Sequence, residues 1–194
     1  MTRLPRLAAA ALVALLALGG AAPAGARPAR TLDEQRESLF TLLSAYEMRV
    51  DRKVLDTIGP DVNDLLVDLA DGPKVRPRVR VRAVSALGYY PSARTKAYLV
   101  SLIHERSLKG SAIGRDLRRQ ALRSYGFAYR DGAVDELLSV KDDPQPLVRE
   151  AVAHGLGDTG SAYAITALET WLDQERDIVV RTAIDRSLDR LRGR

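Results

Sequence analysis

The sequence predicts an all-α fold, specifically an α-solenoid in which antiparallel helix pairs stack into a superhelix. Three observations predict it. A short motif recurs four times along the chain, the apolar residues inside each copy follow helical spacing, and no segment is better explained by the two-residue alternation of a β-strand.

The recurring motif is an apolar residue followed by arginine and, seven positions after the arginine, by Leu-Gly. Its clearest copy contains Val148, Arg149, Leu156 and Gly157. The apolar anchors stand at positions 79, 117, 148 and 180, which are 38, 31 and 32 residues apart. A period of this length is typical of solenoids, in which each unit buries its apolar face only when a neighbour stacks on it. The other copies carry Arg80, Arg118 and Arg181 in the arginine column and Gly88 and Gly126 in the glycine column, whereas Asp189 replaces the glycine of the last copy.

The spacing inside each copy is helical. Val148, Val152 and Leu156 are four residues apart and therefore lie on one face of a helix. Each copy also has an alanine three or four residues after its anchor, at positions 83, 121, 151 and 183, and a small side chain lets two helix axes approach closely. The glycines of the motif, Gly88, Gly126 and Gly157, are expected to end their helices in a left-handed turn, a conformation that glycine adopts without a Cβ penalty.

The third copy resembles the short HEAT-like repeats named after the phycobilisome lyases. The resemblance rests on Asp143-Pro144, Val148-Arg149, Ala151, Leu156-Gly157, Asp158, Ala164 and Leu168, and it extends from about Val62 to Arg192. It implies an α-solenoid of antiparallel helix pairs, found in scaffolds, adaptors and enzyme accessory proteins, a few of them linked to bilin chemistry. The longer first step and the missing Asp-Pro of the second unit depart from the pattern and imply irregular stacking there.

The chain divides into three parts. Residues 1–26 have a basic start at Arg3 and Arg6, an apolar run from Leu7 to Leu18 and a small-residue cleavage site ending at Ala26, which together predict a secretory signal peptide. The apolar run is too short to span a membrane. The protein is therefore expected to be exported to the periplasm or cell envelope and soluble after cleavage. Residues 27–60 are expected to form a tail and capping helices, and residues 61–194 a HEAT-like domain of about four helix pairs.

Individual helix starts are also visible. Thr31 with Glu34 three residues later forms a capping-box pattern that opens a helix running to about Tyr46. A helical turn is expected at Asp51–Ile58, and Asp61 is expected to cap the next helix. Residues 74–82 alternate apolar and basic residues, but Pro77 suits the first turn of a helix better than a strand. Further helices are predicted at about Ala93–Arg106, Ile113–Tyr125, Ala133–Val140, Pro146–Leu156, Ala162–Gln174 and Asp177–Leu191.

Composition narrows the classes of function. The net charge is +5, and it falls to +3 once the signal and its two arginines are removed, so the chain lacks the strong basic excess of a nucleic-acid-binding protein. It has no cysteine, so neither disulfides nor thiolate metal ligands are possible.

No catalytic constellation is recognisable. The two histidines, His104 and His154, are 50 residues apart, and neither belongs to a metal-binding motif such as HExxH. Asp142-Asp143 suits a turn, and the pair Asp185 and Asp189 suits a solvated helix face. The sequence therefore predicts no enzyme activity, no catalytic residues, no metal site and no cofactor.

The arginine column has two interpretations. The four arginines could form a ladder that binds anions, or each could bond carboxylates and carbonyls of an adjacent unit, because a guanidinium offers several fixed donors. The second, structural, interpretation is favoured because this position belongs to the repeat signature of the family that the chain resembles.

Two other columns, which stand two and six residues after each apolar anchor, repeat in position but not in residue type. They are expected to line the concave surface of the solenoid. They supply the candidate partner-binding residues Arg119, Arg123, His154 and Arg186, with Tyr89, Tyr90 and Tyr129 near the turns. We expect a scaffold or adaptor that holds an extended or acidic segment of a protein partner, and no nucleic acid. The alternatives are a solvated basic face, an accessory lyase-like or enzyme-associated subunit, and a binder of anionic polymers. The last helix could either cap the stack or contact a partner.

Overall fold

The computed structural model describes residues 30–46, 50–105, 108 and 110–193, and the regular elements in this part of the chain are all helical. This confirms the all-α prediction. The elements are α1 (Leu32–Ser44), α2 (Arg52–Asp56), α3 (Val62–Asp71), α4 (Pro77–Leu87), α5 (Ala93–His104), α6 (Ala112–Tyr129), the 3-10 helix η2 (Arg130–Ala133), α7 (Val134–Leu138), α8 (Pro146–Thr159), α9 (Ala162–Gln174) and α10 (Ile178–Arg192).

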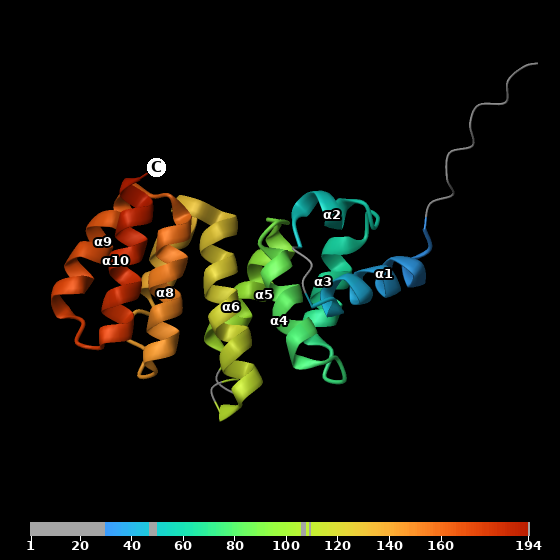
Figure 1. The fold of residues 1–194 in the computed structure, drawn as a ribbon, viewed down its shortest axis with the longest axis horizontal. Coiled ribbons are helices and arrows are strands. Elements are labelled where there is room, and N and C mark those ends of the chain that lie inside the picture. Colours follow the sequence, from blue (N-terminus) through green and yellow to red (C-terminus); the bar gives the residue numbers. More distant parts are fainter. Residues whose placement is uncertain (1–29, 47–49, 106–107, 109, 194) are drawn as a thin grey trace, which may run out of the picture.

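The helices form the two layers of an α-solenoid. Helices α4, α6, α8 and α10 contact one another in that order and make one layer, and α3, α5, α7 and α9 each pack against the member of that layer that follows them in sequence. Figure 1 shows this progression from α1 at one end of the molecule to α10 at the other. Each motif copy therefore lies on the second helix of a pair. The layer formed by α4, α6, α8 and α10 is called the inner layer below, and equivalent motif positions recur from one of its helices to the next.

The N-terminal helices are held by specific caps. Thr31 and Glu34 form the predicted capping box at the start of α1. Gln35, almost fully buried, bonds the backbone N–H and the carboxylate of Asp61 and so ties α1 to the start of α3. Asp61 stands at the predicted N-cap position of α3, but its side chain makes no capping bond because it accepts from Gln35 instead.

The prediction of left-handed turns at the motif glycines is wrong. Gly88 ends α4 with a right-handed φ of −57°, while Gly126 and Gly157 lie inside α6 and α8. Helix α8 instead ends in a left-handed turn at Gly160, with φ of 73°, three residues after the motif. Helix α6 likewise continues to Tyr129 and ends at Arg130, a non-glycine residue with φ of 52°.

Close helix contacts explain Gly126 and Gly157 instead. A Cβ on Gly126 would lie 2.7 Å from the carbonyl carbon of Gly155 and closer still to its oxygen. A Cβ on Gly157 would lie 2.6 Å from the Cβ of Ser187 on α10. The glycines therefore let α6, α8 and α10 approach backbone to backbone, a role that the sequence pattern assigned to the alanines alone.

Two predicted helices have different bounds in the structure. The helix predicted at Ala133–Val140 is shorter, because η2 and α7 share this region, and α5 ends at His104 rather than Arg106. The predicted signal peptide, residues 1–26, lies outside the described residues. None of the helices in the described part is long and apolar enough to cross a membrane.

We expect Gly126→Ala to destabilise the fold by roughly 1–3 kcal/mol, since the added methyl meets rigid backbone of α8 rather than a flexible side chain. Urea denaturation measures this loss. Gly132→Ala is the matched control, because a Cβ on Gly132 meets nothing within 4 Å. Equal stabilities for the two variants would show that α6 and α8 are not in close contact at Gly126.

Candidate functional site

The arginine column bonds to backbone carbonyls between neighbouring helices. Each arginine lies in the N-terminal half of its helix and donates to a carbonyl at the end of the preceding helix or in the loop that follows it. The bonds are Arg80 Nε to Ala70 O at 2.8 Å, Arg118 Nε to Ile103 O at 2.6 Å, Arg149 Nη1 to Asp143 O at 2.9 Å, and Arg181 Nη1 to Leu172 O at 2.6 Å. These contacts support the structural interpretation of the column.

Two of these arginines also pair with an acid of the next repeat. Arg118 donates to Oδ2 of Asp143 at 2.6 Å, and both side chains are only 4% exposed. Arg149 forms a two-pronged pair with Glu175, with distances of 2.8 and 2.9 Å. Because Asp143 and Glu175 each stand five residues before the next apolar anchor, a sequence comparison of the units could have found both acids.

The same two acids accept from their own repeat through the backbone. Arg149 bonds the carbonyl of Asp143, and Arg181 bonds the carbonyl of Glu175. The result is a continuous chain of bonds across three repeats, which we call the arginine–acid ladder: Arg118, Asp143, Arg149, Glu175 and Arg181. Within it Arg118 and Arg149 are paired with carboxylates and Arg181 donates to backbone carbonyls, so the paired part of the ladder is poorly suited to bind an external anion.

The ladder fixes the ionisation of Glu175. The hydrogen bonds from Arg149 lower the pKa of Glu175 to about 2, with smaller contributions from the backbone N–H groups of Asp177 and Arg176, against an opposing effect of burial. The same pairing raises the pKa of Arg149. The pair is therefore fully ionised at neutral pH.

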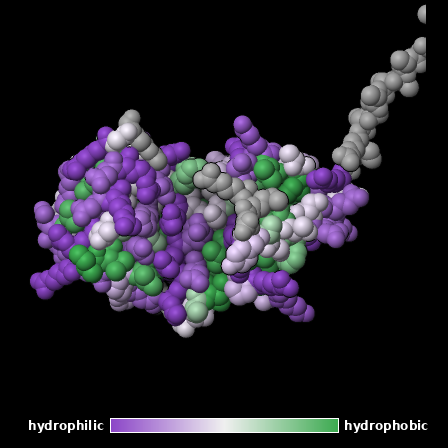
Figure 2. Space-filling view, in the orientation of Figure 1, coloured by the Kyte–Doolittle hydropathy of each residue, from purple (hydrophilic) through white to green (hydrophobic). Residues whose placement is uncertain are grey.

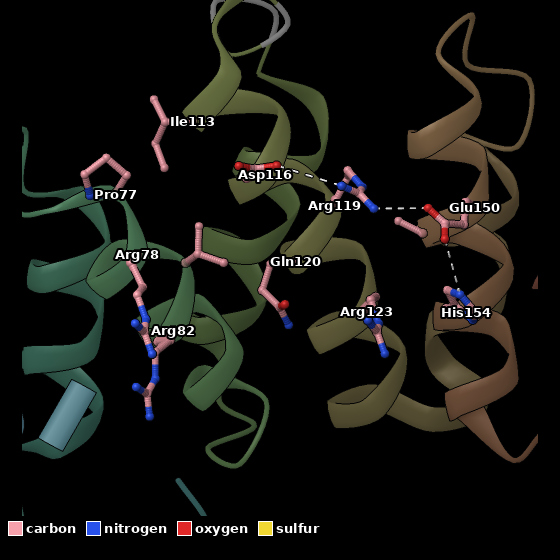
Figure 3. A pocket seen from close by; sticks show the side chains of 12 residues that line it. Pro77, Arg78, Arg82, Ile113, Asp116, Arg119, Gln120, Arg123, Glu150 and His154 are labelled. Atoms are coloured by element: carbon pink, nitrogen blue, oxygen red, sulfur yellow. Dashed lines mark hydrogen bonds and ion pairs between the residues drawn. The ribbon is translucent and has the colours of Figure 1, made fainter. Parts of the chain in front are cut away.

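A groove opens on the exposed side of the inner layer, between α4, α6 and α8 (Figure 3). Its volume is about 470 Å³. It continues into a hollow of about 210 Å³ between α8 and α10 and into another of about 270 Å³ beside α4 and α6, because these spaces share lining residues. We call the three together the groove. Its lining includes Val81, Ser85, Tyr89, Ile113, Arg119, Gln120, Arg123, Phe127, Glu150, His154, Ile178, Val179, Thr182 and Arg186.

The structure brings most of the candidate partner-binding residues together in this groove. Arg119, Arg123 and His154 line its central part, and Arg186 lines the hollow that His154 shares with α10. Tyr89 lines the third space. In Figure 3, Arg119, Arg123 and His154 lie on the facing sides of α6 and α8.

Tyr90 and Tyr129 have other contacts. The Tyr90 hydroxyl donates to Asp56 at 2.7 Å, and Arg52 lies over the Tyr90 ring. The ring of Tyr90 therefore packs against α2 and does not line the groove. The Tyr129 hydroxyl donates to the carbonyl of Ser92. Neither residue lines the groove, because the end of α4 and the longer α6 direct both rings toward neighbouring helices.

The groove arginines differ in how far their charge is already compensated. Arg119 donates to Glu150 at 3.0 Å and to the carbonyl of Leu147 at 3.1 Å. Arg123 and Arg186 are exposed, and neither has a hydrogen-bond or ion-pair partner among the described residues. The positive charge open to a ligand is therefore concentrated at Arg123 and Arg186, on either side of His154.

The surroundings of His154 disfavour its charged form in the free groove. Its side chain is 17% exposed, and its Nδ1 is buried without a hydrogen-bond partner among the described residues. Burial and the charge of Arg123 lower its pKa, and Arg190 adds to the effect, while Glu150 and Asp158 oppose it. His104 lies apart from the groove, paired with Glu136 of α7.

The sequence analysis missed an aromatic corner of the groove. Phe127 is 40% exposed, packs edge-to-face against Tyr89 with ring centroids 5.5 Å apart, and lies 5.2 Å from the guanidinium of Arg130. It follows the motif glycine Gly126, where a turn was expected. The assumed end of the helix hid the fact that Phe127 continues the groove face of α6.

Arg78 and Arg82 at the other end of the groove were missed as well. Both donate to backbone carbonyls after α1, Arg78 to Tyr46 at 3.0 Å and Arg82 to Ala45, and Arg78 also lies over the Tyr46 ring at 4.3 Å. The alternation of basic and apolar residues over 74–82 was the sequence feature that could have drawn attention to these two arginines. These contacts bind the N-terminal helix to the inner layer.

The residues that line the groove are suited to binding an extended segment of another molecule. In the part of the chain that the structure describes, no three His, Cys, Asp or Glu residues gather as a metal site would need. Figure 2 shows a face with many hydrophilic side chains and hydrophobic ones in small separate groups. A shallow groove with arginines, one histidine, a few apolar residues and an aromatic corner can hold an extended segment with acidic and apolar side chains.

Comparison with known proteins agrees with the fold. Residues 115–189, which run from the first turn of α6 to most of α10, match a family model described as HEAT repeats. No curated protein matches the chain. With its stacked helix pairs and the repeated arginine contacts, the chain is a HEAT-like repeat protein, and this kind of fold is a protein-interaction scaffold.

We expect the stability of the protein to fall in acid partly through Glu175. Its folded-state pKa of about 2 lies below the ordinary 4.5, so its contribution is fully present above about pH 4.5 and is lost as the pH falls toward 2. Glu175→Gln should therefore cost about 1–3 kcal/mol at neutral pH and give a smaller loss of stability between about pH 7 and pH 3 than the wild type.

Urea denaturation at both pH values measures the difference. Glu169→Gln is the control, since Glu169 pairs with Arg192 at an exposed site and its variant should keep the wild-type pH dependence. If Glu175→Gln loses as much stability in acid as the wild type does, the ladder does not hold Glu175 ionised.

Proposed function

We propose that the protein is an exported, non-catalytic scaffold or adaptor that binds a protein partner along the groove, with an extended acidic segment of the partner crossing α4, α6, α8 and α10. The observation that carries the proposal is the pair of exposed arginines, Arg123 and Arg186, that lack a partner among the described residues and flank one groove. Two uncompensated guanidinium groups on a shared surface favour a ligand with carboxylates.

The apolar residues of the groove add a second requirement. Ile113 lines its central part, and Ile178 and Val179 line the hollow between α8 and α10, where Ile178 is 73% exposed. All three stand near the N-terminal ends of their helices. A segment that places acidic side chains over Arg123 and Arg186 could therefore place apolar side chains against this edge, which favours a peptide over a uniform anionic polymer.

Two parts of the proposal rest on sequence. Export is supported by the signal-peptide pattern of residues 1–26, with its basic start, apolar run and small-residue cleavage site. The absence of catalysis is supported by the sequence, which offers neither a nucleophile with a base nor a pair of carboxylates set apart from a solvated surface.

Binding to a defined peptide tests the function. We expect a fluorescein-labelled octapeptide of alternating Asp and Gly to bind the purified protein, and the double variant Arg123→Gln/Arg186→Gln to bind it about three- to tenfold more weakly, since each exposed charge contributes a fraction of a kcal/mol. Fluorescence anisotropy measures both affinities. Arg119 is left intact because its removal would also unpair Glu150.

Two controls distinguish the alternatives. Arg192→Gln removes an exposed arginine of α10 that pairs with Glu169 outside the groove, and it should leave the affinity unchanged. An Asn-Gly peptide of equal length should not bind. If heparin binds with a steep dependence on salt while the Asp-Gly peptide does not bind, the protein is a polyanion binder and the proposed function is wrong.

A further inference from the structure

His154 occupies the centre of the groove and belongs to two of its parts. It lines the space between α4, α6 and α8, and it also lines the hollow between α8 and α10. Arg123 contributes to the first space and Arg186 to the second. An extended segment that contacts both arginines therefore has to pass over this histidine.

The charges that face His154 come from three helices, and most of them compensate one another. On α6, Arg119 is held by Glu150, and on α10, Arg190 is held by Asp158 at 2.5 Å. What remains uncompensated is one arginine on each side. The charged groups around His154 are Asp116, Arg119 and Arg123 from α6, Glu150 and Asp158 from its own helix, and Arg186 and Arg190 from α10. Across the same central space, Arg78 and Arg82 of α4 donate to the carbonyls of Tyr46 and Ala45.

The free groove disfavours a positive charge on this ring. The nearest carboxylate oxygen, Oε1 of Glu150, lies 3.8 Å from Nε2, which is too far for a hydrogen bond, and Glu150 also serves Arg119. Nδ1 is buried and has no acceptor among the described residues, so protonation would bury a donor that is not hydrogen-bonded. An added negative charge beside the ring would reverse this balance.

We infer that an acidic segment in the groove places a carboxylate over His154 between Arg123 and Arg186, and that binding is coupled to protonation of this histidine. The inference rests on the proposed function and adds its regulation by pH. The carboxylate attracts the two arginines and stabilises the imidazolium in the same position, so three cations from three successive helices share one anionic side chain.

The direction of the pH effect follows from this linkage. Burial and Arg123 hold the pKa of the free His154 below its ordinary value, and a bound carboxylate raises it. The additional affinity is fully present below the pKa of the free protein and is lost as the pH rises through the pKa of the complex. One unit of difference between the two pKa values corresponds to about a tenfold change in affinity.

The chain offers a direct measurement, because it contains only two histidines. NMR titration of the ring protons follows both, with His104→Gln used to assign them and His104 serving as an internal reference outside the groove. The probe is the Asp-Gly octapeptide, whose carboxylates stay ionised at about pH 5. We expect the peptide to raise the pKa of His154 by about one unit, to leave His104 unchanged, and to bind about three- to tenfold more tightly at about pH 5 than at about pH 8.

His154→Gln supplies the matched variant, since glutamine keeps a polar side chain but does not titrate. Whatever its affinity at about pH 8, this variant should show little change in affinity between about pH 8 and about pH 5, whereas the wild type gains about three- to tenfold. A peptide that binds through Arg123 and Arg186 without moving the pKa of His154 would overturn the inference and leave the proposed function standing. Failure to bind at either pH would overturn both.

Discussion

The structure depends on the arginine–acid ladder, in which an arginine of one repeat pairs with an acid of the next while a second arginine bonds the backbone of that same acid. Arg118, Asp143 and Arg149 form one step, and Glu175 and Arg181 continue it. Hydrophobic stacking alone is non-directional and would tolerate sliding of one helix pair over another. Because a guanidinium fixes its donors in a plane, each step also sets the position and angle of the next repeat.

The ladder and the motif glycines together explain why a groove exists. Close backbone contact at Gly126 and Gly157 brings α6, α8 and α10 together, and the ladder holds their N-terminal halves in register. Residues at equivalent positions of successive helices therefore line one continuous groove. The ladder arginines donate to carboxylates and carbonyls of the solenoid itself, so the groove depends on a different set of arginines. This division separates the arginines that build the solenoid from those that remain open to a ligand.

Local rules predicted the parts of the structure that local interactions decide. The capping box of Thr31, the helix start at Pro77 and the period of the apolar anchors all depend on residues within one or two turns. Gly88 does end α4, though not in a left-handed turn, whereas the prediction of helix ends at Gly126 and Gly157 was wrong because glycine has two uses, in left-handed turns and at close helix contacts. Spacing within one helix does not distinguish the two, since the second depends on a helix about 30 residues away. Phe127 was missed for the same reason.

The sequence by itself determined that the chain is an α-solenoid of HEAT-like repeats and which residue columns recur along it, because a period of 31 to 38 residues and helical apolar spacing follow from the chain alone. Only the tertiary structure decided which arginine of each repeat is bonded to a neighbouring repeat and which remains accessible to a ligand. Arg118 and Arg119 are adjacent in sequence, yet one is buried against Asp143 and the other lies in the groove beside Glu150. The charge that remains for a partner is set by the distances between repeats, and these arise only when the helices stack.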